Sequence, residues 1–380
     1  MKQGWIETGL GEICEVLDTK RKPITKRNRT EGDIPYYGAT GIVDWVKDYI
    51  FDEPLILLGE DGAKWDSGEN SAFKIEGKTW VNNHAHVLRP IREKVMDNWL
   101  IYNLNYQNLL SFVTGLTVPK LNQGNMRTIP IPIPPLEEQK RIVTKLDECF
   151  EAIDKARVNV EKNLNNAKEL FQSQLNQIFS QKGDGWVEKK LGEVCIVERG
   201  SSPRPIKDYL TESEDGVNWI KIGDTKNVEK YIYATKQKIT KEGANRSRFV
   251  DVGDFILTNS MTYGKPYIMK TKGYIHDGWF VLRLPDEINS EFFWYLLASP
   301  YTMEQFEYLA AGAIVKNISG DLVKKAILPI PPIGEQATIV EKMDTLSSQT
   351  QFLESNFQQE LDALDELKKS ILQKAFNGEL

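Results

Sequence analysis

The residue patterns that come nearest to catalytic motifs in this chain of 380 residues lack essential members. Residues 59–64 (GEDGAK) and 263–266 (YGKP) have neither the spacing nor the terminal hydroxyl of the phosphate-binding loop GxxxxGK[ST]. Residues 133–136 (IPPL) and 330–333 (IPPI) lack the amide or carboxylate and the aromatic residue of the Asn/Asp-Pro-Pro-aromatic loop that adenine methyltransferases use. The sequence therefore argues against ATP hydrolysis and methyl transfer by this chain.

A nuclease-like set of one Asp followed by Glu-x-Lys can be assembled from Asp66, Glu76 and Lys78, which together could hold Mg²⁺ beside a scissile phosphate. The second half of the chain has no equivalent set, and 54 acidic and 48 basic residues produce such matches by chance. An autonomous nuclease is therefore only an alternative hypothesis. It predicts Mg²⁺-dependent cleavage by the purified chain, which Glu76→Ala abolishes.

The histidines and cysteines do not predict a metal site. His84 and His86 could place two imidazoles on one face of a strand. The third and last histidine is His276, and no cysteine is near the pair, so polar strand residues or DNA contacts are the favoured interpretation. Cys14 and Cys195 lie in alternating apolar runs, where a small buried side chain is expected. Three cysteines in all are too few for a disulfide framework.

Two basic segments are the main binding candidates. Residues 20–29 (KRKPITKRNR) contain six basic side chains in ten, and the corresponding place in the second half is residues 199–207 (RGSSPRPIK). A charge run is commonly a solvated loop. The matching location in both halves, with Arg, Ser and Asn that bond phosphates and base edges, favours DNA binding instead. The candidate DNA-binding side chains are Lys20, Arg21, Lys22, Lys26, Arg27, Arg29, Lys64, Asn82, Asn83, His84, Lys120, Arg199, Ser201, Arg204, Lys207, Asn259, Ser260, Thr262, Tyr263, Lys265 and Lys316.

These segments occupy the same places because the chain contains an internal repeat. Residues 4–14 (GWIETGLGEIC) return as residues 185–195 (GWVEKKLGEVC), with seven of eleven positions identical. A second match, at an offset of 197, pairs residues 131–139 (IPIPPLEEQ) with residues 328–336 (LPIPPIGEQ). The offset increases from 181 to 197 along the chain, which indicates insertions in the second copy. Loops that vary on a shared framework are typical of a diversified binding surface.

Each copy predicts a mixed α+β domain followed by one long helix. Short alternating and apolar runs, broken by Gly, Asn and Pro, indicate strands. The Ile/Pro segment then predicts extended chain, after which the helix begins. The predicted divisions are two globular domains at residues 1–135 and 183–332 and two helices at residues 136–182 and 333–380.

Both predicted helices carry an apolar seam at alternating steps of four and three residues, in the same phase. Eight of ten seam positions are apolar in each copy. This pattern predicts two long helices that pack lengthwise on each other as a coiled coil. At about 1.5 Å per residue each would be roughly 60 Å long, longer than a domain of this size is wide. The predicted packing residues are Ile142, Leu146, Ile153, Val160, Leu170, Ile339, Met343, Leu346, Leu353, Phe357, Leu364, Leu367 and Ile371.

The two ends of the chain should lie close together. The first helix leads through residues 180–185 into Trp186, and joining residues 376–380 to residues 1–5 would recreate such a junction before Trp5. This correspondence predicts a cyclic, pseudo-twofold arrangement of the two copies.

The whole chain is similar to the specificity subunit of type I restriction-modification systems. The resemblance rests on the Gly-Trp…Leu-Gly-Glu start of each copy, on the pattern Pro-x-Pro-Pro-x-x-Glu-Gln-x-x-Ile-Val at Pro132 and Pro329, and on residues 367–376 (LKKSILQKAF). It implies two target recognition domains that read a bipartite, asymmetric sequence in double-stranded DNA, with the two helices running antiparallel as the spacer. It also implies two modification subunits, which bind S-adenosylmethionine, and restriction subunits, which use ATP and Mg²⁺. This chain itself would hold no cofactor and no catalytic residue.

The charge distribution agrees with such a division of labour. The formal net charge of −6 argues against coating nucleic acid by bulk charge. Residues 331–380 hold four basic and nine acidic side chains, so the last helix accounts for most of the excess. No window approaches roughly 18 consecutive apolar residues and residues 1–7 lack the regions of a signal peptide, so a cytoplasmic protein with no membrane partner is expected. A coiled-coil scaffold that binds proteins and has no DNA selectivity is the main alternative.

Overall fold

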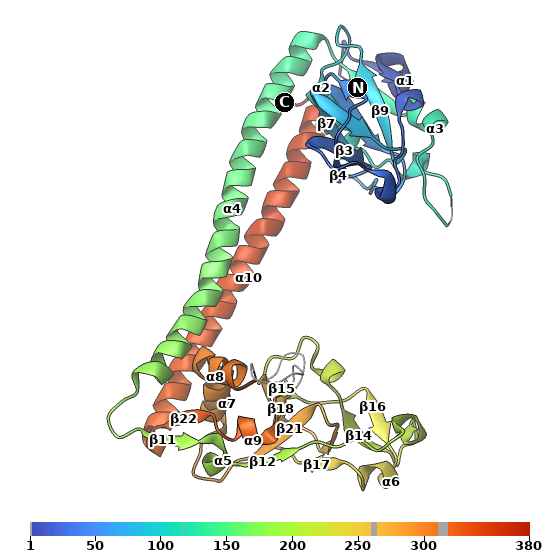
Figure 1. Ribbon diagram of the computed structural model, residues 1–380. Helices are drawn as coiled ribbons and strands as arrows, with labels where there is room; N and C mark the ends of the chain where they lie inside the picture. The colour runs from blue at the N-terminus through green and yellow to red at the C-terminus, as the bar shows by residue number, and fades with distance from the viewer. Residues whose placement is uncertain (1, 116, 260–263, 311–317) are drawn as a thin grey trace. The chain divides into compact units, whose positions relative to one another are not determined.

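The computed structural model describes residues 2–115, 117–259, 264–310 and 318–380 (Figure 1). The chain divides into two compact units. Unit 1 comprises Met1–Glu161 and Gln358–Leu380, and unit 2 comprises Lys162–Phe357. Helices α4 (Leu136–Gln181) and α10 (Ile333–Asn377) each contribute one part to unit 1 and the other part to unit 2.

Two four-stranded sheets form the globular part of unit 1 (Figure 1). The antiparallel sheet consists, in spatial order, of β2 (Cys14–Val16), β9 (Ala85–Pro90), β6 (Leu55–Gly59) and β7 (Ala72–Ile75). The other sheet is mixed and consists of β4 (Gly41–Val46), β3 (Ile34–Gly38), β8 (Lys78–Val81) and β5 (Phe51–Asp52). Strand β6 is buried on both faces: Ile56 and Leu58 join the core on one side, while Leu55 and Leu57 join the core on the other.

Unit 2 repeats this plan with additions. One five-stranded sheet consists of β12 (Ile196–Arg199), β21 (Trp279–Arg283), β18 (Phe255–Thr258), β19 (Pro266–Met269) and β15 (Tyr231–Ile232). The other consists of β13 (Leu210–Thr211), β16 (Gln237–Ile239), β14 (Val217–Ile220), β20 (Gly273–Ile275) and β17 (Arg248–Val250). Strand β18 is the counterpart of β6, because Phe255 and Leu257 face one core and Ile256 faces another. Strand β15 extends the sheet beyond the place of β7, as the predicted insertions require.

A short antiparallel pair leads into each long helix. Strand β1 (Ile6–Gly9) pairs with β10 (Pro130–Ile133), and β11 (Val187–Lys190) pairs with β22 (Ile327–Ile330). In the first pair Ile6 faces Ile133, and in the second Val187 faces Ile330. The start of each copy is thereby bonded to the Pro segment before its long helix, which confirms the predicted internal repeat.

A buried glutamine fixes the first turn of each long helix. Gln139 accepts a hydrogen bond from the Met96 N–H (2.9 Å) and donates to the carbonyl oxygens of Lys94 (2.9 Å) and Pro134 (2.8 Å). Gln336, 197 residues later, accepts from the Asn289 N–H (2.8 Å) and donates to a proline carbonyl (3.1 Å). The Gln of the Glu-Gln motif is therefore a structural anchor that ties the helix to the segment before α2 (Asp97–Tyr106) or α7 (Ser290–Ala298).

The two long helices pack antiparallel within each unit. In unit 1, Arg157 of α4 forms an ion pair with Asp365 of α10, and Arg141, earlier on α4, bonds the carbonyl of Leu380, later in the chain. In unit 2, Leu170 lies near Thr345, while Ile178 lies near Ile339. The predicted packing residues that are buried or partly buried are Ile142, Leu146, Ile153, Val160, Ile339, Met343, Leu346, Phe357, Leu364 and Ile371.

Three predicted packing residues are not buried. Leu170, Leu353 and Leu367 are 49, 40 and 47% exposed. The strict seam repeats every 3.5 residues, whereas an α-helix has 3.6 residues per turn and drifts by about 20° per heptad. The buried stripe therefore moves one position on, and Phe171 packs against the core in place of Leu170. On α10, Thr350 keeps its seam position and is buried, whereas Leu361 is buried one position after the seam residue Glu360.

The two chain ends lie in unit 1, as the repeat predicts (Figure 1). Lys2 forms an ion pair with Glu138 at 3.0 Å, and Phe376 packs edge-on against Trp99 with ring centroids 5.1 Å apart. The internal junction has the matching contact between Phe179 and Phe292, at 5.8 Å. Among the described residues, no helix has both the length and the apolar composition needed to cross a membrane.

Candidate nucleic-acid interface

Polar loops of unit 1 converge where β6 ends and β9 begins. The N–H of Glu60, directly after β6, donates to the carbonyl of His84, directly before β9 (2.9 Å). The N–H of Leu121 donates to the carbonyl of Glu60 (2.8 Å), which brings the segment around Lys120 to the same place. Ends of neighbouring strands are a common position for binding loops, because the rigid sheet holds them.

Arg21 is held inside this cluster. Its guanidinium donates to the carbonyl of Ala85 (2.8 Å), binds the Glu60 carboxylate and lies 3.4 Å from the Asp18 carboxylate. The side chain is mostly buried. Arg21 therefore joins β9 to the basic segment 20–29 and has little capacity left for a ligand.

Lys120 is the cation of this cluster that remains accessible. Its ammonium lies 2.8 Å from Glu60, and its side chain is 46% exposed. Burial alone would raise the pKa of Glu60, but hydrogen bonds from Lys120 and Arg21 bring that pKa below its ordinary value of 4.5. The hydrogen bond that Lys120 donates to Glu60 in turn raises the pKa of Lys120. The charged forms of both partners are thus stabilised.

A buried group lies beneath these residues. His86 contacts the Asp18 carboxylate through Nδ1 (2.6 Å) and the Leu121 carbonyl through Nε2 (2.7 Å). Potential ligand atoms of Asp18, Glu60 and His86 lie within 4.8 Å of one another. Arg21 and Lys120 already supply positive charge to the two carboxylates, so the geometry is that of an ion-pair network.

The other candidate DNA-binding residues of unit 1 differ in their exposure and in their hydrogen-bond or ion-pair partners within the chain. Arg29 binds Asp44 (2.8 Å) and lies over the Tyr36 ring (4.4 Å), and Asn82 is buried and accepts from the His84 N–H (2.8 Å). The exposed candidates are Lys20, Lys22, Lys26, Arg27, Lys64, Asn83 and His84. Of these, Lys64 pairs with Glu69 and His84 with Asp61.

In unit 2, Asp277 accepts hydrogen bonds from the loops that correspond to those around Glu60 in unit 1. Its carboxylate accepts from Ser202 (2.6 Å) and from Arg204 (3.4 Å), and its carbonyl accepts from Arg199 (3.4 Å) and Asn259 (2.7 Å). The hydrogen bond from Ser202 is the largest cause that lowers the pKa of Asp277. Asp277 directly precedes Gly278 and β21, so it occupies the place that Asn83 has before β9.

Among the described residues, the remaining candidate DNA-binding residues of unit 2 form no hydrogen bond or ion pair with Asp277. Ser201 donates to the carbonyl of Arg246 (3.0 Å), Lys207 is exposed, and Lys265 is exposed over the Tyr267 ring (5.2 Å). Four further candidates, Ser260, Thr262, Tyr263 and Lys316, lie outside the described residues.

The backbone confirms that the two clusters are equivalent. The Asn259 N–H donates to the carbonyl of Gly278 (3.1 Å), and the Ile318 N–H donates to the carbonyl of Asn259 (3.2 Å). Glu60 makes the same two bonds in unit 1, to His84 and from Leu121. Sequence reasoning missed the two acidic residues that organise the clusters. A signal was present, since Glu60 follows the apolar run of β6 and Asp277 precedes that of β21.

The nuclease-like residues have other partners. Glu76 lies 3.1 Å from Lys74, and the Lys78 ammonium lies over the Tyr49 ring at 4.9 Å. Neither contact places these side chains in the cluster around Glu60.

The fold defines a class of protein with two repeated domains, each of which presents one polar loop cluster at the ends of its strands. Residues 2–165 and 183–363 each match the family described as the type I restriction modification DNA specificity domain. The chain belongs to this family, and it recognises DNA sequence as a specificity subunit of that type.

Similar proteins extend over nearly the whole chain. A putative type I restriction enzyme specificity subunit from Haemophilus influenzae is 29% identical, covering 90% of this chain and 87% of that one. A type I restriction enzyme specificity subunit from Methanocaldococcus jannaschii is 24% identical, covering 100% and 93%. Among solved structures, a chain from work on complex assembly and conformational transition of the type I system has a TM-score of 0.78 at 20% identity, covering 100% and 99%. The HsdS subunit from Thermoanaerobacter tengcongensis has a TM-score of 0.57 at 21% identity, covering 100% and 98%.

Proposed function

We propose that the chain is the non-catalytic subunit that reads a bipartite, asymmetric DNA target, one half with each globular domain. The observation that carries this proposal is the pair of equivalent loop clusters with different side chains. Glu60 and Asn259 occupy the same backbone position, as do Asn83 and Asp277, so one framework presents two chemistries. Two unequal readers on one chain suit an asymmetric target.

The same proposal assigns the enzymatic steps to partners. Two modification subunits would bring S-adenosylmethionine and methylate adenine, and restriction subunits would use ATP and Mg²⁺. The chain would dock both kinds of subunit in the cytoplasm. The type I specificity family and the absence of a complete catalytic motif in the sequence support this division.

Methylome sequencing of a host with and without the gene tests the proposal. The expected result is one adenine-methylated motif, made of two defined parts separated by undefined bases, that disappears with the gene. Complementation with the wild-type gene restores it. An unchanged methylome in a host that retains active partner subunits would contradict the proposal. It would favour a coiled-coil scaffold, which predicts no sequence-selective duplex binding even with partners present.

A further inference from the structure

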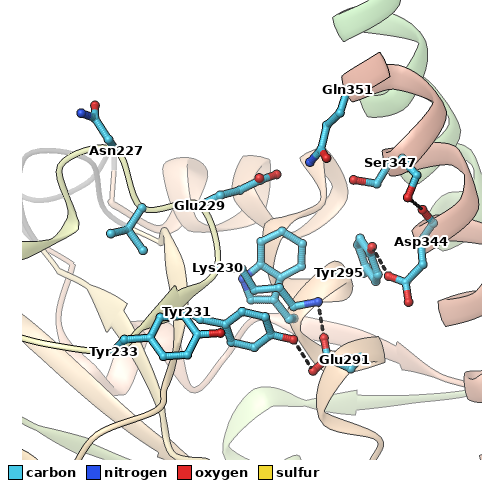
Figure 2. A pocket seen from close by; sticks show the side chains of 13 residues that line it. Asn227, Glu229, Lys230, Tyr231, Tyr233, Glu291, Tyr295, Asp344, Ser347 and Gln351 are labelled. Carbon is cyan, nitrogen blue, oxygen red and sulfur yellow. Dashed lines mark hydrogen bonds and ion pairs between the residues drawn. The ribbon is translucent and has the colours of Figure 1, made fainter. Parts of the chain in front are cut away.

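Unit 2 contains a pocket of about 570 Å³ away from its loop cluster. Three elements line it: the inserted segment 227–233, which includes β15, the helix α7, and the part of α10 from Asp344 to Gln351 (Figure 2). Each contributes polar atoms beside aromatic rings. The pocket therefore has the chemistry of a recognition site.

The floor of the pocket already holds one cation. The Lys230 ammonium lies 4.6 Å from the ring centroid of Trp294 and 4.9 Å from that of Tyr295, and it forms an ion pair with Glu291 (Figure 2). Aromatic faces attract cations through their quadrupole, and a neighbouring carboxylate adds to that attraction. The residues at the floor of the pocket therefore bind a cationic group, the ammonium of Lys230.

The mouth of the pocket carries further negative charge. The Glu229 carboxylate points from the inserted segment toward α10, and among the described residues it has no ion pair (Figure 2). Asp344 is exposed and accepts a hydrogen bond from the Tyr295 phenol at 2.5 Å. Tyr233 is 69% exposed at the same mouth. The lining residues include three carboxylates and one ammonium, and the Lys270 ammonium lies 4.5 Å from the ring centroid of Tyr231. The remaining negative charge favours a cation over the phosphates of DNA.

The corresponding place in unit 1 is closed. Phe150 is the repeat counterpart of Ser347, and it packs edge-on against Tyr102 with ring centroids 5.3 Å apart. The Lys368 ammonium lies 5.0 Å from the Phe150 ring. In unit 1, therefore, an aromatic side chain and a cation of the chain itself occupy this position.

In unit 2 the phenylalanine lies at a different position from Phe150 in unit 1. The counterpart of Lys368 is Phe171, which packs against Tyr295 with ring centroids 6.4 Å apart. Ser347 then leaves the α10 side of the pocket open, and β15 adds the opposite wall. The pocket is therefore formed by two independent differences between the copies. One is the exchange of side chains at two helix positions, and the other is the inserted strand β15.

We propose that this pocket binds an arginine or lysine side chain of one modification subunit. The inference rests on the proposed function and adds to it the docking chemistry and an asymmetry. The partner's cation would lie between Glu229 and Asp344, beside the exposed ring of Tyr233. A second modification subunit would meet the closed surface of unit 1, so the two copies would dock with unequal affinity.

Calorimetric titration of the full chain with its cognate modification subunit tests the proposal. The double variant E229Q/D344N removes the charge at the mouth and keeps the hydrogen-bond acceptor for Tyr295, and S347F closes the pocket with the residue that the other copy uses. Each should weaken one of the two binding steps about tenfold and leave the other unchanged. The matched control is D147N, because Asp147 accepts from Tyr102 as Asp344 does from Tyr295. This control should leave the binding step at the unit 2 pocket unchanged.

The outcomes distinguish a failure of the docking proposal from a failure of the proposed function. Affinities within twofold of wild type for both steps in E229Q/D344N would overturn the docking proposal, whatever the folding of S347F. A loss of spermidine binding with unchanged subunit binding would also overturn it, because the pocket would then serve a polyamine. A wild-type chain that binds no modification subunit at all would instead contradict the proposed function itself.

Discussion

The Lys120 ammonium lies 2.8 Å from one oxygen of the Glu60 carboxylate, and Arg21 binds the other oxygen. Glu60 is only 7% exposed, so one buried acid orients an accessible lysine and a mostly buried arginine. A carboxylate in such a polar loop cluster holds hydrogen-bond donors in place before any ligand arrives.

This arrangement predicts a pH dependence of unit 1 stability. Because the pKa of Glu60 is lowered from 4.5 and that of Asp18 from 3.8 in the folded chain, their contribution is complete above those ordinary values and is lost as the pH falls through the lowered ones. We expect Glu60→Gln to cost about 1–3 kcal/mol at pH 7, since it removes one of the two carboxylates that pair with Arg21, and much less at pH 2. Urea unfolding at both pH values measures this. Equal costs at both would contradict the ion-pair account.

Lys120→Ala should weaken DNA binding without unfolding unit 1. If its ammonium neutralises one phosphate, the slope of log affinity against log salt falls by about one. Fluorescence anisotropy of the assembled complex on its target duplex gives the slope. Lys155→Ala is the control, because Lys155 is exposed on α4 and pairs only with Glu151 among the described residues. An unchanged slope for Lys120→Ala would place this lysine outside the DNA contact.

The two buried glutamines should contribute equally to the free energy of unfolding. Gln139→Ala leaves the Met96 N–H and the Lys94 carbonyl without partners, and Gln336→Ala does the same to the Asn289 N–H. Each substitution should lower the free energy of unfolding by about 1–3 kcal/mol. Denaturant unfolding measures the loss, and Lys140→Ala, at an exposed neighbouring position, should change it little. A neutral Gln139→Ala would show that water replaces the amide.

A circular permutant should fold. The chain ends lie together in unit 1, and Phe179 and Phe376 make matching contacts at the two junctions. Joining residue 380 to residue 1 through a short flexible linker and opening the chain at residue 183 should keep the melting temperature within a few degrees, because both sites are exposed connections. Opening the chain inside β6 should abolish folding. Failure of the first permutant with success of the second would refute the cyclic interpretation.

Lengthening both long helices tests whether they set the target's spacer. One heptad inserted into α4 and into α10 near the boundary between units adds about 10 Å of helix to each. We expect a longer undefined spacer in the methylated motif and two unchanged half-sites. A changed half-site with the original spacer would refute the ruler hypothesis.

Local patterns predicted much of the fold. The repeat, the strand runs and the helix starts at Leu136 and Ile333 follow from spacing, proline positions and apolar periodicity. The heptad assignment did not predict that Leu170, Leu353 and Leu367 are exposed, because a period of 3.5 and one of 3.6 diverge only over many turns.

The candidate site was predicted by segment and not by side chain. Basic segments and loop positions were visible, but Glu60 and Lys120 are 60 residues apart, and only the packed sheet brings them together. Arg21 and Asn82 belong to the predicted set, yet the structure uses their polar groups internally. Which donors remain for DNA is decided by long-range packing, which composition does not record.

The paired glutamines also affect how such a gene could change. Gln139 and Gln336 make the same anchoring bonds at the starts of α4 and α10, and the strings around them are nearly alike. Unequal recombination within these strings would exchange one domain for another and still place a glutamine where the helix needs it. The repeat therefore provides crossover points at which new DNA specificities could arise in a single event without loss of the fold.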